Sequence, residues 1–364
     1  MKKLICPVLV CALLLSGCSW MEGSYVSVKP HQVGYQQEDW NDTVISGYSE
    51  LRSALTSLVD NMETEAVFSL SNYSEESANS HMETMIHHIL HVYPAGAYSV
   101  KEITYEIGQN LLSVQISYSR SKTEMDLIQT VRGTDGAKAA IDQALGDCAN
   151  SLTLMITGYV DVDYVQYIAD YAALHPEIVM ELPQVSAQVY PQQGNTRILE
   201  LQFAYQTSRS SLRDMAAQVR PVFSSARLYV TSDADDGTKL SQLYSFLMER
   251  FDYTVQTSLT PSYSLLCHGV GDSRAFAQVY AAMCRQSGLE AMTVSGTCNG
   301  ESRFWNIVRD GEIYYHVDLL ECARQGYYRE LTDEEIYGYV WDYSAFPPCG
   351  YLPEEANVPE TTAP

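Results

Sequence analysis

Basic residues are scarce in this sequence, which holds 22 Lys and Arg against 45 Asp and Glu and has a net charge of −23. Proteins that bind nucleic acid neutralise its phosphates with a surplus of Lys and Arg. The acidic balance therefore argues against nucleic acid as a partner, and against binding to anionic lipid by charge alone.

Long apolar runs are also missing, apart from a short one near the start. A transmembrane helix needs about 20 apolar residues, and the run from Val8 to Leu15 is much shorter. It follows Lys2 and Lys3, and a basic start before a short apolar run is typical of a secretory signal. The alternative, an ordinary buried segment, does not account for the basic start and the small residues that follow.

The end of this run, Leu15-Ser16-Gly17-Cys18, resembles the lipobox of bacterial lipoproteins. The resemblance implies cleavage of residues 1–17 and a lipid on the Cys18 sulfur, which would hold the protein on a membrane. We therefore expect a cell-membrane protein, lipid-anchored and facing outside the cytoplasm. Residues 18–45 would form a tether, and the Pro/Glu/Thr-rich residues 353–364 a disordered tail.

Metal-binding cysteine patterns are absent from the sequence. Of nine cysteines, Cys6 and Cys11 would leave with the signal, and none of the others forms a Cys-x-x-Cys pair. We expect no metal and no cofactor. An envelope location permits one disulfide, for instance Cys322 with Cys349, and the connectivity stays open.

An internal repeat occupies the middle of the chain. The segment Ser113-Val-Gln-Ile-Ser-Tyr aligns with Glu200-Leu-Gln-Phe-Ala-Tyr, and Val67–Tyr73 resembles Thr153–Tyr159. The pattern predicts two small α/β sandwiches in tandem, repeat 1 at 46–135 and repeat 2 at 136–229. Predicted strands are 65–71, 98–107, 111–119, 151–158, 185–191 and 197–206; predicted helices are 75–92, 162–174, 121–149 and 208–228.

Four histidines, His81, His87, His88 and His91, fall in the first predicted helix. His87 and His91 are four residues apart and so share a helix face, which would suit a metal. No acidic or cysteine partner is evident nearby in the sequence, so a solvated helix face is the favoured interpretation.

The stretch from Ser262 to Asp318 carries the most informative motif. Tyr263 precedes Gly271-Asp272-Ser273, which opens a predicted helix over 274–287 that ends near Gly288-Leu289. Arg303-Phe304-Trp305-Asn306 follows, and then Tyr314-Tyr-His-Val-Asp318. A lead-in helix is predicted from Asp236 to Tyr253, because apolar residues recur there at helical spacing.

This order resembles the core of the transglutaminase-like superfamily, with its Gly-x-Cys, His-x-Trp-Asn and Val-Asp motifs. The resemblance implies an α+β, papain-like fold at 230–352, in which a helix packs on an antiparallel sheet. This domain is expected to fold alone. Ser273 then stands at the position of the family's Cys and Arg303 at that of its His; only Asp318 matches. Tyr263, Trp305 and Asn306 would lie in the pocket wall.

The chemistry of such a site needs a base. Arg303 cannot serve, because a guanidinium stays protonated. Ser273 is therefore interpreted as an N-cap hydroxyl, and Arg303 is predicted to pair with Asp318. His316, which should share a strand face with Asp318, is the remaining candidate base, although a packed strand histidine is the favoured interpretation. Cys267 and His268 are placed on an approach loop.

Three functions fit these residues. The first is a lipoprotein whose inactive transglutaminase-like domain binds an envelope peptide or protein. The second is a hydrolase or acyltransferase that uses Ser273 with His316 and Asp318. The third is a structural spacer. The missing thiol and imidazole favour the first.

Overall fold

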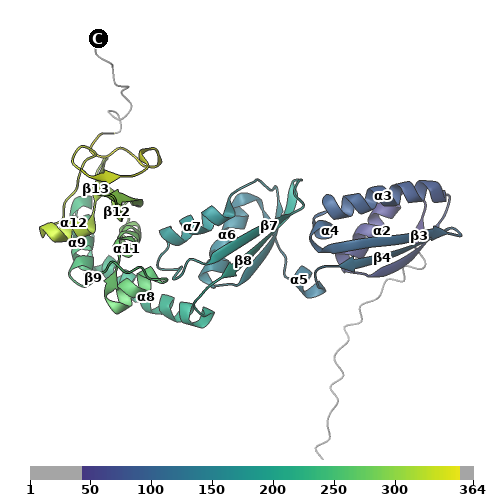
Figure 1. The fold of residues 1–364 in the computed structure, drawn as a ribbon, viewed down its shortest axis with the longest axis horizontal. Helices are drawn as coiled ribbons and strands as arrows, with labels where there is room; N and C mark the ends of the chain where they lie inside the picture. The colour runs from purple at the N-terminus through teal and green to yellow at the C-terminus, as the bar shows by residue number, and fades with distance from the viewer. Residues whose placement is uncertain (1–42, 353–364) are drawn as a thin grey trace, which may run out of the picture.

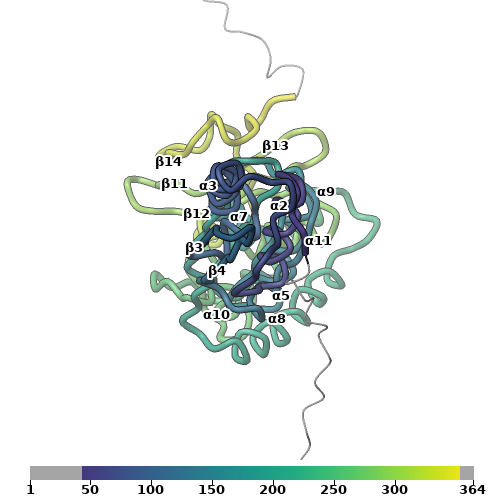
Figure 2. Tube along the Cα trace, turned by 90° about the vertical axis from the view of Figure 1, so that its right-hand side faces the viewer, coloured from purple at the N-terminus to yellow at the C-terminus, as the bar shows by residue number. Residues whose placement is uncertain are grey.

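The computed structural model describes residues 43–352, which form three units placed end to end along the long axis of the molecule (Figure 1). We call them the first unit (44–118), the second unit (129–204) and the C-terminal unit (209–352). Viewed along that axis, the units lie behind one another (Figure 2). The expected signal peptide, Cys18 and the tail fall outside the described residues. Between residues 43 and 352, no helix is both long and apolar enough to cross a membrane.

The first unit is a two-layer sandwich with a four-stranded sheet in the order β1-β2-β4-β3. Side chains alternate between the faces of a strand, and Leu112, Val114 and Ile116 of β4 are buried against α2 and α3. The Ser74 side chain begins α3 by accepting the backbone N–H of Ser77, a common N-cap contact. The elements are β1 (Val44–Ile45), α2 (Tyr48–Asn61), β2 (Glu65–Leu70), α3 (Glu75–His91), α4 (Pro94–Ser99), β3 (Val100–Gly108) and β4 (Leu111–Tyr118).

The second unit has the same sheet order, β5-β6-β8-β7, with a core between the sheet and helices α6 and α7. Leu152, Leu154 and Ile156 of β6 alternate into this core as the corresponding residues do in the first unit. Its elements are β5 (Gln129–Arg132), α6 (Gly133–Gly146), β6 (Ser151–Thr157), α7 (Tyr164–Leu174), β7 (Gln184–Tyr190) and β8 (Thr196–Ala204).

The prediction of one long helix over residues 121–149 is wrong. A short helix, α5 (Lys122–Asp126), is followed by β5 and then by α6. Gly133 has φ of +63°, a left-handed conformation that interrupts a helix and that glycine adopts without strain. β5 pairs in parallel with β6 as β1 pairs with β2. These short first strands were missed, and β1 also means that the expected tether is already part of a sheet at residues 44–45.

A buried carboxylate closes the junction between the first two units. Glu200 of β8 accepts a hydrogen bond from Arg120 Nη2 at 2.6 Å and one from the Tyr98 hydroxyl at 3.2 Å. The Arg120 guanidinium also lies over the Tyr98 ring, 4.7 Å from its centroid. Because a buried charge is costly unless it is paired, these contacts hold the first unit against β8 of the second.

The C-terminal unit packs a central helix, α11, on an antiparallel sheet in the order β13-β12-β11-β14. Every residue of α11 from Ala275 to Cys284 is buried, so the helix is enclosed on all sides over this stretch. The elements are α8 (Arg209–Tyr229), α9 (Asp236–Met248), β9 (Asp252–Tyr253), α10 (Pro261–His268), β10 (Val270–Gly271), α11 (Ser273–Gln286), β11 (Ala291–Cys298), β12 (Glu301–Asp310), β13 (Ile313–Val317), α12 (Leu319–Gln325), β14 (Tyr339–Val340) and a 3-10 turn at Tyr343–Ala345.

The core of this unit does not stop at residue 230. It includes Leu212, Val219 and Phe223 of α8, and also Met180 from the loop between α7 and β7. A fragment that begins at residue 230 would remove α8 and expose the apolar surfaces of α9, α10 and α11. The expectation that residues 230–352 fold alone therefore has to be extended to include α8.

Candidate functional site

Ser273 is the first residue of α11, and its hydroxyl is bonded to the sheet. Its Oγ accepts the backbone N–H of Phe304 on β12 at 3.3 Å. The N-cap is the preceding residue, Asp272, whose Oδ1 accepts the N–H of Ala275 at 2.9 Å. The expectation that Ser273 caps the helix is thus corrected: Asp272 caps α11, and Ser273 ties its start to β12.

Arg303, the neighbour of Phe304 on β12, forms a two-pronged ion pair with Asp318. Its Nε donates to Asp318 Oδ2 at 2.7 Å and its Nη2 to Oδ1 at 2.8 Å, which is the pairing predicted from the sequence. Burial lowers the pKa of Arg303, but the hydrogen bonds and charge of Asp318 outweigh this and raise the pKa above its usual value. The guanidinium therefore stays protonated and cannot accept a proton.

Asp318 has further donors besides Arg303. As the N-cap of α12, its Oδ1 accepts the N–H groups of Leu320 and Glu321. The hydroxyl of Tyr339 on β14 donates to its Oδ2 at 2.7 Å. The carboxylate is only 2% exposed, and these donors satisfy both of its oxygens. Tyr339 could not be identified from the sequence, because β14 reaches the site through its pairing with β11.

The site thus combines the start of a buried helix with a carboxylate at the end of a neighbouring strand. Residues 225–351 match the family model of the transglutaminase-like superfamily. The chain carries a transglutaminase-like domain. A search of curated proteins gives no match. The expected fold, a helix on an antiparallel sheet, is the one observed.

Solved structures similar to this chain include a TGase (8% identity, TM-score 0.26, covering 46% of this chain and 50% of that one). Another is a proposed cysteine protease from Cytophaga hutchinsonii (10% identity, TM-score 0.26, covering 43% of this chain and 70% of that one). A third is a proposed protease from Parabacteroides distasonis (7% identity, TM-score 0.23, covering 46% of this chain and 40% of that one). The chain spans about half the length of the TGase. At TM-scores this low, the assignment of the transglutaminase-like domain rests on the sequence match.

His316 is not placed to act as a base for Ser273. It is paired with Ile307 across the sheet, and both belong to the face that packs Trp305, Ile336 and Cys349 rather than α11. The imidazole is fully buried, and both ring nitrogens are bonded: Nδ1 accepts from Trp305 Nε1 at 3.1 Å, and Nε2 lies 2.8 Å from Asp333 Oδ1. The interpretation of His316 as a packed strand histidine fits this geometry.

The same side chains form a cluster with metal-ligand chemistry that the sequence did not reveal. One ligand atom each of His316, Asp333 and Cys349 lie within 4.8 Å of one another. A metal-bound histidine normally donates its second N–H to an acceptor. Here the second nitrogen, Nδ1, accepts from the indole N–H of Trp305, which can only donate. The neutral imidazole must therefore carry its proton on Nε2 and donate it to Asp333, so the cluster fits a hydrogen-bonded chain better than a metal site.

Of the three residues expected in the pocket wall, Trp305 and Asn306 are fully buried, and Tyr263 is half-buried. Trp305 is packed edge-on against Tyr339 and Trp341. Asn306 is buried, and its Nδ2 donates to the carbonyls of Ala277 and Met292, which joins α11 to β11. Tyr263 packs against the His268 ring.

The region expected to be an approach loop is also different, because Cys267 and His268 are the last residues of helix α10.

The cysteines of the described region are all free. Cys322 belongs to the core around α11, where its Sγ donates to the Arg329 carbonyl, while Cys349 lies in the cluster on the other side of the sheet. The suggested disulfide between these two is therefore corrected. Burial raises the pKa of the Cys322 thiol to about 11 and raises that of Cys349 as well, so both stay protonated.

His87 and His91, the candidate histidine pair of α3, pack against each other with ring centroids 4.8 Å apart. They border an open cavity of about 580 Å³ whose other wall is the β7–β8 hairpin. Neither ring belongs to the one metal-ligand cluster found among residues 43–352.

The Arg303–Asp318 pair should stabilise the domain strongly. Arg303→Met leaves a buried carboxylate without its cation, which costs about 3–5 kcal/mol of unfolding free energy for a buried pair. We expect the lower end, because the Arg303 side chain is 20% exposed. Denaturant unfolding of Arg303→Met, Asp318→Leu and the double variant gives the coupling energy.

The control is Arg324→Met, which breaks an exposed pair with Glu321 on α12 and should change the unfolding free energy far less, because water screens an exposed pair. A coupling energy of zero between Arg303 and Asp318 would contradict the structural pairing.

His316 should make stability depend on pH. Burial lowers its pKa below 6.5, and the attraction of Asp333 offsets this only in part. Between the folded and unfolded pKa values the unfolded chain binds more protons. This stability is therefore complete above the unfolded pKa of about 6.5 and is lost as the pH falls from there through the lower pKa of the folded state. His316→Gln keeps a donor toward Asp333 but does not titrate. Unfolding free energies between pH 7.5 and 5 should fall more steeply for the unsubstituted protein than for His316→Gln.

The exposed His268 of the same domain provides a surface control, His268→Gln. Parallel pH profiles of the unsubstituted protein and His316→Gln would show that burial does not hold His316 neutral.

Proposed function

We propose that this protein is a lipid-anchored envelope protein whose transglutaminase-like domain binds a peptide or protein without catalysing a reaction. One observation carries the proposal. At the positions where the family has its His and its Asp, Arg303 donates hydrogen bonds to both carboxylate oxygens of Asp318. A guanidinium in this place can hold a carboxylate, but it cannot take a proton from a nucleophile.

The surroundings of Ser273 support the same conclusion. An alkanol needs a base to become a useful nucleophile, and the nearest alternative, His316, is bonded to Trp305 and Asp333 on the other side of the sheet. Loss of general-base assistance alone reduces rates by about 10²–10⁴-fold. A hydrolase or acyltransferase built on Ser273, His316 and Asp318 therefore has less support than a binding role.

The anchoring part of the proposal depends on Cys18 and the signal-like residues before it. Its motive is the Leu15-Ser16-Gly17-Cys18 motif behind a short apolar run. A lipid at Cys18 would place the binding units on the outer side of the membrane, where envelope peptides and proteins are the accessible partners.

The purified protein should lack amidase, peptidase and amine-incorporation activity, and a fluorophosphonate should not label Ser273. The physical reason is that Arg303, at the position of the family's His, stays protonated and cannot take the proton of the Ser273 hydroxyl. The measurement is in-gel fluorescence after labelling, with Ser273→Ala as the background. Labelling or turnover that Ser273→Ala removes would establish the enzyme alternative.

Cys18→Ser should release the protein from the membrane, because the lipid is the only stable attachment that the sequence suggests. The distribution is measured by immunoblotting of membrane and soluble fractions after a high-salt wash. Cys11→Ser, within the expected signal, is the matched control and should stay in the membrane fraction. Retention of the Cys18→Ser protein on the membrane would refute lipid anchoring.

A further inference from the structure

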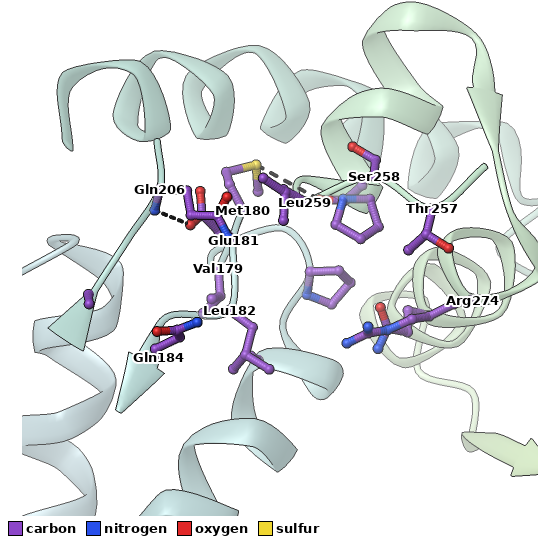
Figure 3. A pocket seen from close by; sticks show the side chains of 16 residues that line it. Val179, Met180, Glu181, Leu182, Gln184, Gln206, Thr257, Ser258, Leu259 and Arg274 are labelled. Atoms are coloured by element: carbon purple, nitrogen blue, oxygen red, sulfur yellow. Dashed lines mark hydrogen bonds between the residues drawn. The ribbon is translucent and has the colours of Figure 1, made fainter. Parts of the chain in front are cut away.

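A cavity of about 260 Å³ lies where the second unit meets the transglutaminase-like domain. The second unit contributes the loop between α7 and β7, including Val179, Met180 and Leu182, while the transglutaminase-like domain contributes Leu259 and the start of α11 (Figure 3). The family match begins at residue 225, so half of this cavity lies outside it. The cavity could not be predicted from the sequence, because its walls are far apart along the chain.

Two polar side chains of α11 face the cavity without partners. Arg274 and Gln278 are four residues apart and so lie on one face of the helix; both line the cavity, and Arg274 points into it (Figure 3). Gln278 is only 7% exposed. In the described part of the chain, neither side chain has a hydrogen-bond or ion-pair partner. The unpaired polar groups of both side chains therefore open into the cavity, where a ligand can complete their contacts.

Among the described residues, the opposite wall of the cavity forms no ion pair with Arg274. Its one carboxylate, Glu181, is 4% exposed and already accepts the backbone N–H groups of Gln206 and Thr207, at 2.6 Å and 3.0 Å. Between Glu181 and Arg274 the walls are largely apolar, with Val179, Leu182 and Leu259. The cavity therefore presents an unpaired cation at one side, an unpaired amide beside it and apolar walls opposite.

These features select an occupant. A carboxylate matches the guanidinium of Arg274. The Gln278 amide both donates and accepts, as a peptide group does, whereas a fatty acid would leave it unpaired. A free amino acid would also bring an ammonium group. Glu181, the carboxylate of this cavity that could pair with it, already accepts two backbone N–H groups. The volume lies just below the roughly 300–1,000 Å³ of drug-sized ligand sites, so it suits one or two residues rather than a large cofactor.

We propose that this cavity binds the C-terminal end of a peptide. The terminal carboxylate pairs with Arg274, the last peptide group bonds to Gln278, and an apolar terminal side chain lies against Leu182 and Leu259. The inference rests on the binding role proposed above and gives it a ligand class. Arg274 directly follows Ser273 in the sequence, but the proposed peptide site lies at the junction with the second unit.

The test uses the purified full chain and fluorescein-labelled tetrapeptides Gly-Gly-Ala-X, where X is Ala, Val, Leu or Met. Each is made with a free C-terminal carboxylate and with a C-terminal amide, and binding is followed by fluorescence anisotropy. We expect at least one free-carboxylate peptide to bind with a Kd below about 1 mM, and its amide to bind at least about tenfold more weakly. No binding by any peptide, or equal binding of acid and amide, would overturn the inference.

Variants locate the site. Arg274→Gln should weaken binding of the carboxylate peptide about 10–100-fold and Arg274→Lys less, whereas Arg227→Gln, at an exposed arginine of α8, should leave it unchanged. Gln278→Met should weaken binding about 2–10-fold without lowering the unfolding free energy, because its amide has no partner to lose. Unchanged affinity in both Arg274→Gln and Gln278→Met would place the peptide elsewhere and overturn the inference.

One further readout separates this inference from the proposed function. Chromatography of the bound peptide should recover it intact, and Ser273→Ala should bind it as the unsubstituted protein does. A shortened peptide would contradict the non-catalytic role. If the peptide is recovered intact but does not bind, only the cavity assignment is contradicted.

Discussion

The carboxylate of Asp318 is the point on which the transglutaminase-like domain depends. It receives the guanidinium fork of Arg303 from β12, the hydroxyl of Tyr339 from β14 and two backbone N–H groups from the first turn of α12. An ionised group this deeply buried is tolerated only when its oxygens are bonded. Three elements of the domain are therefore held in place by one side chain.

The same interaction distinguishes this site from a Cys–His–Asp site. In a Cys–His–Asp site the carboxylate orients an imidazole, and that imidazole must remain free to exchange protons. A guanidinium with a raised pKa exchanges none and contributes only attraction. Ser273, bonded to the Phe304 amide, has likewise become part of the contact between helix and sheet. The contacts of Ser273, Arg303 and Asp318 thus contribute packing and charge balance to the domain.

Much of this arrangement could be predicted from sequence, because it depends on local pattern. The long strands of both sandwiches and the pairing of Arg303 with Asp318 follow from alternation, turns and motif spacing. The short parallel strands β1 and β5 could not be predicted, since two to four residues carry too little periodicity. The contacts of His316 and the cavity at Arg274 depend on loops such as those holding Asp333 and Met180, whose positions only tertiary packing decides.

The two junctions of this elongated molecule differ in mechanical character. At the first junction, Glu200 accepts hydrogen bonds from Arg120 and Tyr98, so any rotation there would stretch these contacts. At the second, Met180 of the second unit lies in the apolar core of the transglutaminase-like domain, and Arg285 of α11 donates a 2.6 Å hydrogen bond to the carbonyl of Leu174 at the end of α7. A core shared by two units resists their separation, because parting them would expose its apolar side chains to water. The three units are therefore coupled in series, and a force that turns one of them is carried through both junctions.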